Sequence, residues 1–395
     1  MDRTMETAPT SQPLAGKKVL LGVTKSNWGG AQAYVAMMAK GARAEGARVV
    51  VMAGSESGKE KSAPGRLFEI LKAENIPTIP LSAIERDFGI LTEWRALKEL
   101  VHVIRKERPD VLHLNSSKMG ALGSIAGLLA GVKCIIFTAH GWPYLEQRPL
   151  WWKALAWAGA WPIVVFSSKI ICVSDYDLRT APVIFLRDKL VHIDNGIEQF
   201  PMLSPEETRT ALTERAPDLK KFSTWLFMTA ELHPNKGIAT AIRALSELAT
   251  RHPDLALIVC GEGEDRARLT ELALSLNVSD RVFLLGFVPD ARKYLRGANI
   301  FLMPSRKEGM PLAVLEAGLA SLPVIATKVG GIPDIIVEKK TGLFMPRGNT
   351  HILALSIAHL LNHPDEAKHL GTNLYEEVVT QFSARSMVSK TLALY

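Results

Sequence analysis

The chain has 395 residues, nearly half of them apolar, which is enough for two globular α/β domains with large cores. Its formal charge of +7 favours an anionic partner, but no run of lysine and arginine is long enough for a nucleic-acid arm. The three cysteines (Cys134, Cys172 and Cys260) are scattered in apolar runs, which excludes a disulfide framework and a cysteine metal site and favours a reducing cytoplasm.

The first part of the chain alternates between short apolar runs and helix-length amphipathic segments. The polar residues 1–16 lack the apolar stretch of a signal peptide, so we expect a disordered lead-in. Helical patterns cover Ala31–Gly46 and Leu91–Glu107. Short, wholly apolar strands between helices are typical of a parallel sheet covered on both faces. The expected strands are Lys17–Val23, Arg48–Ala53, Val111–Asn115, Lys133–Thr138, Ile170–Ser174 and Leu190–Asp194.

Residues 149–173 are strongly apolar, and Lys153 and Lys169 are their only charged residues. Three interpretations are open: a buried helix followed by a core strand, a surface that dips into a membrane interface, and a transmembrane helix. Pro162 interrupts the stretch, which disfavours the transmembrane helix. Because tryptophan rings settle at headgroup depth, the second interpretation predicts contact with an anionic membrane through Trp151, Trp152, Trp157 and Trp161.

A second series of apolar runs follows residues 195–222, which carry no strand pattern. We therefore place a domain boundary there and expect a first domain over residues 17–195 and a second over residues 196–382. The helix-like residues 383–395 are expected to pack back on the first domain. Two doubly wound sheets would bind a ligand at the carboxyl ends of their strands. The expected strands of the second domain are Trp225–Ala230, Leu255–Cys260, Val282–Leu285, Ile300–Met303 and Pro323–Ala326.

Several residues that could carry chemistry follow directly on expected strands. Gly29 and Gly30 precede a helix, where glycine lets the backbone approach an anion. They do not form the G-x-G-x-x-G fingerprint of dinucleotide binding, and a plain tight turn is an equal interpretation. His140 either points into the crevice or is structural. Lys236, at the start of a helix, could meet a diphosphate or lie in solvent.

The strongest local signal lies in residues 304–336, PSRKEGMPLAVLEAGLASLPVIATKVGGIPDII. Glu308 lies at the mouth of a loop, and Pro311 suits the first turn of the helix that follows. Glu316 lies about 12 Å further along the helix axis, so the two carboxylates could clasp diols at opposite ends of a nucleotide sugar. Backbone N–H groups that could receive sugar or phosphate oxygens are those of Gly309, Met310, Leu312, Gly330 and Gly331.

These motifs resemble those of the family-four retaining glycosyltransferases of the GT-B fold, from Lys17 to Tyr395. The most specific match is E-x7-E, from Glu308 to Glu316. The resemblance implies two Rossmann-like, doubly wound parallel-sheet domains facing across a cleft, a nucleotide-sugar donor, and no bound metal or other cofactor. Further matching segments are GGAQ at Gly29–Gln32, HG at His140–Gly141, VSDYDLR at Val173–Arg179, IDNGIE at Ile193–Glu198, NKG at Asn235–Gly237 and LGFVPD at Leu285–Asp290.

The resemblance also implies a role for each candidate residue. Glu316 would bind the ribose hydroxyls, and Glu308 would face the donor sugar. Lys236 would neutralise the diphosphate, and His140 would line the transfer site. The base would lie against Phe287 and Val288. The remaining donor contacts would come from Gly30, Gly309, Met310, Pro311, Leu312, Gly330 and Gly331.

One position departs from the family pattern. Members usually carry an arginine five positions before the lysine, and here that position is Glu231. A carboxylate beside a diphosphate is unfavourable unless it is turned away or paired. Either another cation takes the place of the arginine, with Arg306, Lys307 and Arg266 as candidates, or donor affinity is altered, or the residue has a different role.

The resemblance implies that a hexosyl or N-acetylhexosaminyl unit passes from a nucleotide sugar to a glycan or polyprenyl-linked acceptor. The expected process is assembly of a surface polysaccharide such as lipopolysaccharide, at the inner face of the cytoplasmic membrane. A nucleotide-sugar epimerase on the same scaffold is one alternative, and it would need no acceptor. A two-domain sugar-binding protein is another, and such proteins are usually exported. We expect no nucleic-acid partner.

Overall fold

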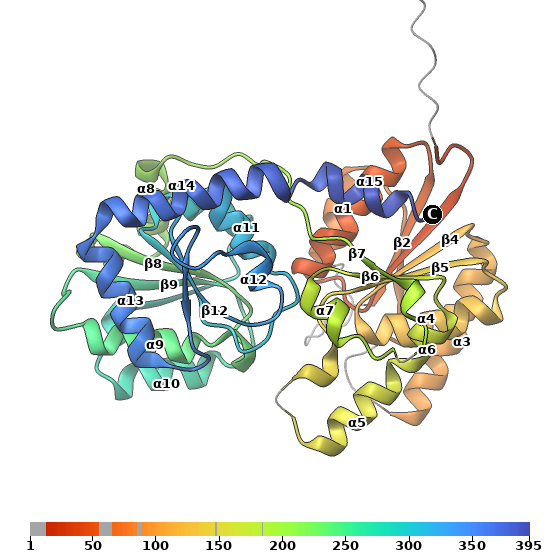
Figure 1. The fold of residues 1–395 in the computed structure, drawn as a ribbon, viewed down its shortest axis with the longest axis horizontal. Coiled ribbons are helices and arrows are strands. Elements are labelled where there is room, and N and C mark those ends of the chain that lie inside the picture. The colour runs from red at the N-terminus through yellow and green to blue at the C-terminus, as the bar shows by residue number, and fades with distance from the viewer. Residues whose placement is uncertain (1–12, 55–64, 85–88, 147, 184) are drawn as a thin grey trace, which may run out of the picture.

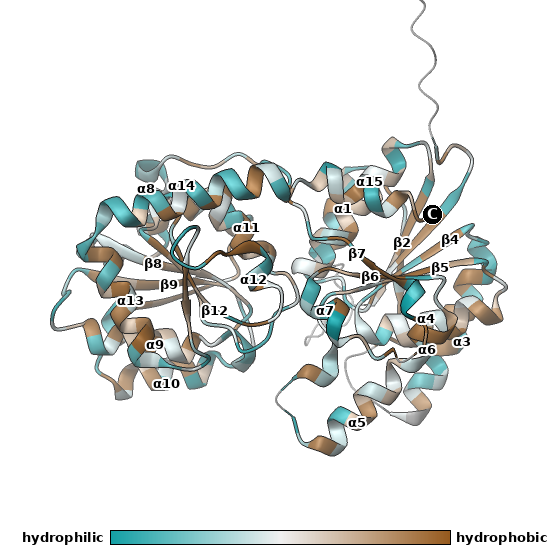
Figure 2. Cartoon of the chain, in the orientation of Figure 1, coloured by the Kyte–Doolittle hydropathy of each residue, from teal (hydrophilic) through white to brown (hydrophobic). Residues whose placement is uncertain are grey.

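The chain folds into two lobes that lie side by side, each with one parallel sheet and helices on both of its faces (Figure 1). The strands are the most apolar parts of both lobes, and polar residues lie on the outer sides of the helices (Figure 2). We call the part built on the first sheet the first lobe and the part built on the second sheet the second lobe. The computed structural model describes residues 13–54, 65–84, 89–146, 148–183 and 185–395.

The first lobe is built on seven parallel strands in the order β3-β2-β1-β4-β5-β6-β7. The direction of strand addition reverses between β1 and β4, and α/β sheets bind ligands beyond the carboxyl ends of the strands at such a point. Branched apolar side chains fill the sheet, with Val19 of β1 opposite Val111 of β4. The strands are β1 (Lys18–Val23), β2 (Arg48–Gly54), β3 (Thr78–Leu81), β4 (Val111–Asn115), β5 (Cys134–Ala139), β6 (Lys169–Cys172) and β7 (Leu190–His192).

The helices of the first lobe bury apolar stripes against the two faces of this sheet. Val35 and Met38 pack on one face, and Met119 and Ala126 pack on the other. The helices are α1 (Gly30–Ala44), α2 (Arg66–Ala73), α3 (Ile90–Glu107), α4 (Ser117–Leu129), α5 (Leu150–Gly159), α6 (Trp161–Phe166) and α7 (Asp175–Thr180), with short 3-10 turns η1 (Pro143–Leu145) and η2 (Arg187–Lys189).

The second lobe repeats this plan with six parallel strands in the order β10-β9-β8-β11-β12-β13. Its strand order reverses between β8 and β11, so a second switch point lies there. The strands are β8 (Thr224–Thr229), β9 (Leu255–Cys260), β10 (Val282–Gly286), β11 (Ile300–Met303), β12 (Val324–Thr327) and β13 (Leu343–Met345). Its helices are α8 (Pro205–Arg215), α9 (Ile238–Leu248), α10 (Arg266–Ser275), α11 (Leu312–Leu319), α12 (Ile332–Ile335), α13 (Thr350–Asn362) and α14 (Pro364–Gln381), with η3 (Pro217–Lys221), η4 (Pro234–Lys236), η5 (Ser279–Arg281) and η6 (Ala291–Gly297).

The chain passes between the lobes twice, at neighbouring places. Ile197, after the first lobe, forms a parallel bridge with Ser383, after α14. A Cβ atom on Gly196 would lie 2.5 Å from the carbonyl oxygen of Ser383, so the two passages touch. Helix α15 (Ala384–Leu392) then lies along α1 of the first lobe (Figure 1).

The structure differs from the sequence-based expectation in two strands and in the N-terminal lead-in. Strands β3 and β13 were not expected: β3 contains a proline and only its last residue is buried, and β13 is a short run between Gly342 and Pro346. Residues 1–12 of the expected lead-in lie outside the described residues. Residues 13–16 form a turn in which Leu14 is buried in the core of the first lobe, so the lead-in is shorter than expected.

The first half of the apolar stretch 149–173 is not a buried helix. It forms α5 and α6 before strand β6, and no residue of α5 is buried. The buried-helix interpretation is therefore wrong for α5, although Ile163 and Val164 of α6 are buried. Among the described residues, no helix is both long and apolar enough to cross a membrane.

Candidate functional site

Two loops of the second lobe are joined at its switch point. One follows β8 and carries Lys236, and the other follows β11 and carries Glu308. The N–H of Arg306 donates to the carbonyl oxygen of Asn235 at 2.7 Å. Gly237 has a φ of +68°, and a Cβ atom there would lie 1.9 Å from the carbonyl oxygen of Pro304, so this close approach requires glycine.

The joined loops bring two of the predicted residues into direct contact. The Nζ atom of Lys236 lies 2.7 Å from Oε1 of Glu308, and the Glu308 residue is only 9% exposed. Each side chain neutralises the charge of the other. An anionic donor would find the ammonium group already fixed in place, at the cost of sharing or breaking the ion pair.

Glu316 lies in the middle of α11, which begins at Leu312 with Pro311 as its N-cap residue. Burial raises the pKa of the Glu316 carboxyl to about 7, while the charge of Arg292 acts in the opposite direction. Burial of the ionised carboxyl lowers the stability of the folded protein. A group with such a perturbed pKa is a candidate ligand-binding group. Proline has no backbone N–H, so Pro311 could contact a nucleotide sugar only through its ring or its carbonyl oxygen.

The two residues predicted to contact the nucleotide base, Phe287 and Val288, differ in exposure. Phe287 is exposed beyond the end of β10, whereas Val288 is buried in the core of the second lobe. Only the phenyl ring of Phe287 therefore has a free face for stacking, and Val288 would contribute backbone. The charge of Arg292 lowers the pKa of Glu316. The guanidinium of Arg292 lies 4.3 Å from the ring centroid of Phe200.

The first lobe meets this site through His140 and Gly141, which follow β5. A Cβ atom on Gly309 would lie 2.8 Å from the carbonyl carbon of His140 and 3.0 Å from the N atom of Gly141. Only a residue without a side chain fits here. The contact places the backbone of His140 directly beside the residue that follows Glu308, so the structure brings these predicted residues from the two lobes together.

The imidazole of His140 is held neutral and in one orientation. Burial lowers its pKa to about 4, so one ring nitrogen carries a proton and the other does not. Nε2 lies 3.1 Å from Oδ1 of the fully buried Asn115, an atom that can only accept. Nε2 is therefore the protonated nitrogen, and Nδ1 is left as an acceptor. The ring of Tyr34 lies edge-on at 4.9 Å between centroids.

A chain of polar side chains lies beneath His140 and was not predicted from the sequence. His113, fully buried, has Nε2 2.7 Å from the Thr138 hydroxyl and Nδ1 2.6 Å from the Tyr395 hydroxyl. Thr138 in turn donates to the Tyr34 hydroxyl at 3.2 Å. Burial lowers the pKa of His113 to about 3, so it is neutral and its two nitrogens can serve as one donor and one acceptor. The network reaches His140 through the ring of Tyr34, and it includes Tyr395, which follows α15.

Gly30 begins α1 beyond the carboxyl end of β1, at the switch point of the first lobe. A Cβ atom there would have no heavy atom within 4 Å, so open space lies beside it. Gly29, the N-cap residue, has extended backbone angles that any residue can adopt. The open space, and not backbone strain, is what makes Gly30 suitable for contact with a ligand.

The two glycines after β12 serve mainly to pack against the Glu308 loop. A Cβ atom on Gly330 would lie 1.9 Å from the carbonyl oxygen of Glu308, and Gly330 has a φ of +55°. The N–H of Gly331 donates to the carbonyl oxygen of Gly309 at 2.5 Å. The Gly331 amide is thus already used, and the prediction that it offers a donor to phosphate is wrong for this arrangement.

Three further contacts tie the lobes together around the site. The Asn195 side chain donates from Nδ2 to the carbonyl oxygen of Met310 at 2.8 Å. The backbone N–H of Asp175 donates to Oδ2 of Asp334 at 2.8 Å. Lys307 places its Nζ 3.3 Å from Oε1 of Glu146. The sequence motifs contained most of these residues, but no pattern indicates which of them pair across the lobes.

The unusual Glu231 is exposed, so its carboxylate is turned towards solvent. Of the three candidate replacements for the family's arginine, Arg266 is excluded, because its guanidinium donates to the carbonyl oxygen of Leu284 on edge strand β10. Lys307 lies between the lobes, and burial lowers its pKa while Glu146 opposes this. Arg306 is exposed next to Lys236 through its backbone bond to Asn235. Arg306 and Lys307 therefore remain as candidates.

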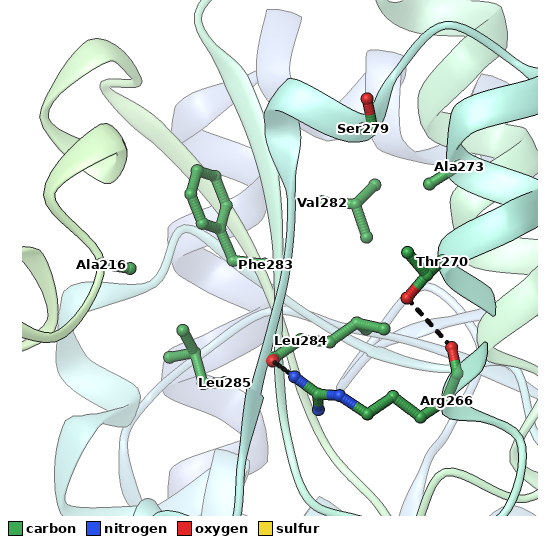
Figure 3. A pocket seen from close by; sticks show the side chains of 9 residues that line it. All are labelled: Ala216, Arg266, Thr270, Ala273, Ser279, Val282, Phe283, Leu284 and Leu285. Atoms are coloured by element: carbon green, nitrogen blue, oxygen red, sulfur yellow. Dashed lines mark hydrogen bonds between the residues drawn. The ribbon is translucent and has the colours of Figure 1, made fainter.

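One hollow of the second lobe lies apart from these residues. It has a volume of about 330 Å³ and lies against edge strand β10, between that strand and α10 (Figure 3). It contains none of the predicted donor residues, and it is lined by Ala216, Arg266, Thr270, Ala273, Ser279, Val282, Phe283, Leu284 and Leu285. Among the described residues, the potential metal-ligand group His192, Asp194 and Asp334 has its ligand atoms within 4.8 Å of one another, and it includes neither Lys236 nor Glu308.

Two Rossmann-like lobes that meet around a lysine, a carboxylate and a histidine have the architecture of the GT-B fold. The sequence profile of the family described as Glycosyltransferase Family 4 matches residues 28–199. That of Glycosyl transferases group 1 matches residues 213–377. The chain belongs to the family-four glycosyltransferases, and both the fold and the enzyme class predicted from its motifs are confirmed.

Among proteins of similar sequence, the UDP-Gal:alpha-D-GlcNAc-diphosphoundecaprenol alpha-1,3-galactosyltransferase of Escherichia coli is 26% identical over 78% of this chain and 81% of its own length. The capsular polysaccharide biosynthesis glycosyltransferase CapM of Staphylococcus aureus is 23% identical over 85% of this chain and 88% of its own length. Among solved structures, Anabaena HepE in complex with UDP-glucose has a TM-score of 0.78 at 20% identity, covering 96% of this chain and 100% of HepE.

Proposed function

We propose that this enzyme transfers a hexosyl or N-acetylhexosaminyl unit, with retention at the anomeric carbon, to a glycan or polyprenyl-linked acceptor during assembly of a surface polysaccharide. The names of the E. coli and S. aureus relatives, one for a diphosphoundecaprenol-linked substrate and one for a capsule, support the acceptor class. The structure of HepE with UDP-glucose supports a UDP-sugar as the donor. The enzyme would work at the inner face of the cytoplasmic membrane, where such an acceptor and the donor can meet.

The observation that carries the proposal is the contact between Glu308 and Lys236, 2.7 Å apart, next to the backbone of His140 from the opposite lobe. Lys236 follows the first strand of the second sheet, at its switch point, where phosphate groups bind in folds of this kind. Glu308 lies on the side of the first lobe, and Glu316 lies deeper along α11. A nucleotide sugar laid along this line would have its ribose near Glu316, its diphosphate near Lys236 and its sugar near Glu308.

Stabilisation of the leaving group would supply most of the rate. The bond between the anomeric carbon and a diphosphate oxygen breaks, and the departing nucleoside diphosphate gains negative charge. The ammonium group of Lys236, fixed before the donor arrives, would stabilise that charge without reorganisation. A neutral His140 with Nδ1 as an acceptor would take a hydrogen bond from a sugar hydroxyl and would not add positive charge beside the anomeric carbon.

Contact between the lobes would keep water, the competing acceptor, away from the reacting carbon. Lys307 and Glu146 form an ion pair between the lobes, and Asn195 holds Met310 from the first-lobe side. Lys307 also lies next to the residue after His140, because a Cβ atom on Gly141 would be 3.7 Å from Cε of Lys307. These contacts support a reaction in which the lobes stay closed while the sugar moves from the donor to the acceptor oxygen.

The test is a panel of nucleotide sugars, each offered with and without a short-chain polyprenyl diphosphate acceptor that carries one sugar. We expect one donor to release its nucleoside diphosphate in an acceptor-dependent way, and Lys236→Ala to be strongly impaired. The anomeric configuration of the product, read from its proton coupling constants, should equal that of the donor. Inversion would refute the proposed mechanism, and conversion of the donor to an epimer without acceptor would favour an epimerase. Ligand-induced stabilisation without any turnover would indicate a sugar-binding protein.

A further inference from the structure

Helix α5 has an exposed apolar surface that the fold itself does not explain. None of its residues is buried, and Leu150, Trp151 and Leu155 are 82%, 65% and 64% exposed. A helix that belonged only to the lobe's core would turn such side chains inward. In Figure 2 the helix lies at the edge of the first lobe, with apolar residues along it. The exposed apolar side chains therefore indicate a surface that contacts a partner outside the chain.

The exposed residues gather on one side of the helix. Trp151, Ala154, Leu155 and Ala158 follow the i, i+3, i+4, i+7 spacing of a helical stripe and all are exposed. Trp152, Lys153 and Ala156 have the intermediate exposure of the side that faces the lobe. We call the outward side the α5 outer face, and it consists of Leu150, Trp151, Ala154, Leu155, Trp157 and Ala158.

The four tryptophans predicted to contact a membrane do not all belong to this face. Trp152 lies under the guanidinium of Arg148, 5.5 Å from the ring centroid. Trp161, in α6, packs edge-on against Trp157 at 5.5 Å between centroids. Trp151 and Trp157 are therefore the two exposed rings, and Trp152 and Trp161 have intermediate exposure.

The sequence around α5 is predominantly basic, although Arg148 lies 3.8 Å from Oε2 of Glu146. No acidic residue occurs from residue 148 to residue 174, while Arg148, Lys153 and Lys169 do. A second copy of the chain seated on this face would bring these cations against their own counterparts, which is unfavourable. An anionic lipid surface complements them, and tryptophan and leucine side chains enter the interface between headgroups and acyl chains.

We propose that the α5 outer face docks on an anionic lipid bilayer, with the helix lying in the plane of the membrane. The inference rests on the proposed function, because it explains how a lipid-linked acceptor would reach the site. Helix α5 packs against η1, and η1 follows directly on His140, Gly141 and Trp142. Docking through α5 therefore fixes the predicted transfer site next to the bilayer surface, where the head of a polyprenyl-linked sugar projects.

The test compares binding to vesicles of pure phosphatidylcholine with binding to vesicles that also contain phosphatidylglycerol, measured by co-sedimentation of the full chain. One variant carries Trp151→Glu and Leu155→Glu. Its matched control carries Leu274→Glu and Leu355→Glu, which change comparably exposed residues of the second lobe, 59% and 50% exposed. Circular dichroism and thermal unfolding check that both variants fold like the parent chain.

We expect the parent chain and the control to bind the anionic vesicles at least about tenfold more tightly than the α5 variant. Binding should weaken as salt is raised, because cations contribute to it. With a short-chain, water-soluble acceptor and no vesicles, the α5 variant should turn over the donor within about twofold of the parent rate, because no site residue is altered. This vesicle-free assay tests the transferase function separately from the docking.

Three results would overturn the inference. One is equal vesicle binding by the α5 variant and the control. Another is equal binding of the parent chain to neutral and anionic vesicles. The third is a dimer in solution that the α5 variant converts to a monomer, which would identify a second copy of the chain as the occupant of this face.

Discussion

The replacement Glu316→Gln should make the unliganded enzyme more stable while it weakens donor binding. The carboxyl group of Glu316 sits in α11 with a pKa raised to about 7 by burial, against a usual value of 4.5. Its charged form is therefore destabilised in the folded protein relative to the unfolded chain. A glutamine fills nearly the same volume and never ionises, so it removes this penalty, and it also replaces one of the two acceptor oxygens available to a ribose diol with an NH2 donor.

The size and the pH range of the effect follow from the shift. Because the pKa of Glu316 is higher in the folded protein than in the unfolded chain, protonation of this carboxyl stabilises the fold. This stabilisation is fully present below pH 4.5 and is lost as the pH rises through about 7. At pH 8.5 the shift corresponds to an upper bound of about 3 kcal/mol in the free energy of unfolding, and nearby Arg292 and residual solvent reduce it. The variant should therefore exceed the parent by about 1–3 kcal/mol at pH 8.5 and equal it at pH 4.5.

The free energy of unfolding would be measured in urea at both pH values for the parent, Glu316→Gln and Glu376→Gln. Glu376 is an exposed residue of α14, so its replacement should change little at either pH. Thermal shift with UDP would report donor binding, which Glu316→Gln should weaken. The reasoning would be refuted if Glu316→Gln lowered stability at pH 8.5, or if its gain were the same at both pH values.

Three more replacements test individual parts of the site. Lys236→Ala should lower turnover by about two orders of magnitude, measured as nucleoside diphosphate release, and cost only about 1–2 kcal/mol in the free energy of unfolding; an unchanged rate would remove this residue from the mechanism. Gly30→Val should raise the donor KM by about tenfold in a vesicle-free assay, whereas Gly159→Val, also in open space, should not; equal effects would contradict donor contact at Gly30. Gly237→Ala should destabilise the protein by at least about 2 kcal/mol in urea unfolding, because its φ is +68° and a Cβ atom would lie 1.9 Å from the Pro304 oxygen; parent-like stability would show that this loop can move.

The sheets were predictable because their physical signal is local. A buried parallel strand is a short apolar run, and three expected strands, Val111–Asn115, Leu255–Cys260 and Ile300–Met303, have the bounds seen in the structure. Strand β3 escaped because its proline and partly exposed residues do not look like a core strand. The buried-helix interpretation was wrong for α5 because the sequence pattern of an apolar helix is the same whether the helix packs against protein or against another apolar phase.

The candidate residues were predictable as a set, but their contacts were not. Motif spacing placed Lys236 and Glu308 at the ends of strands, yet it cannot state that their side chains pair at 2.7 Å. The network under His140 joins residues that are far apart in the sequence, such as His113 and Tyr395, whose atoms are 2.6 Å apart. Such pairings depend on how two lobes and a returning helix come together, which no local pattern encodes.

The returning helix α15 also sets the order in which the protein can be completed on the ribosome. Met387 and Leu392 belong to the hydrophobic core of the first lobe, and the Tyr395 hydroxyl contacts His113 within it. During translation, strands β1 to β7 emerge well before these residues, so the first lobe must wait with part of its core open while the whole second lobe is synthesised. The core of the first lobe can therefore be completed only after the last residues of the chain have left the ribosome.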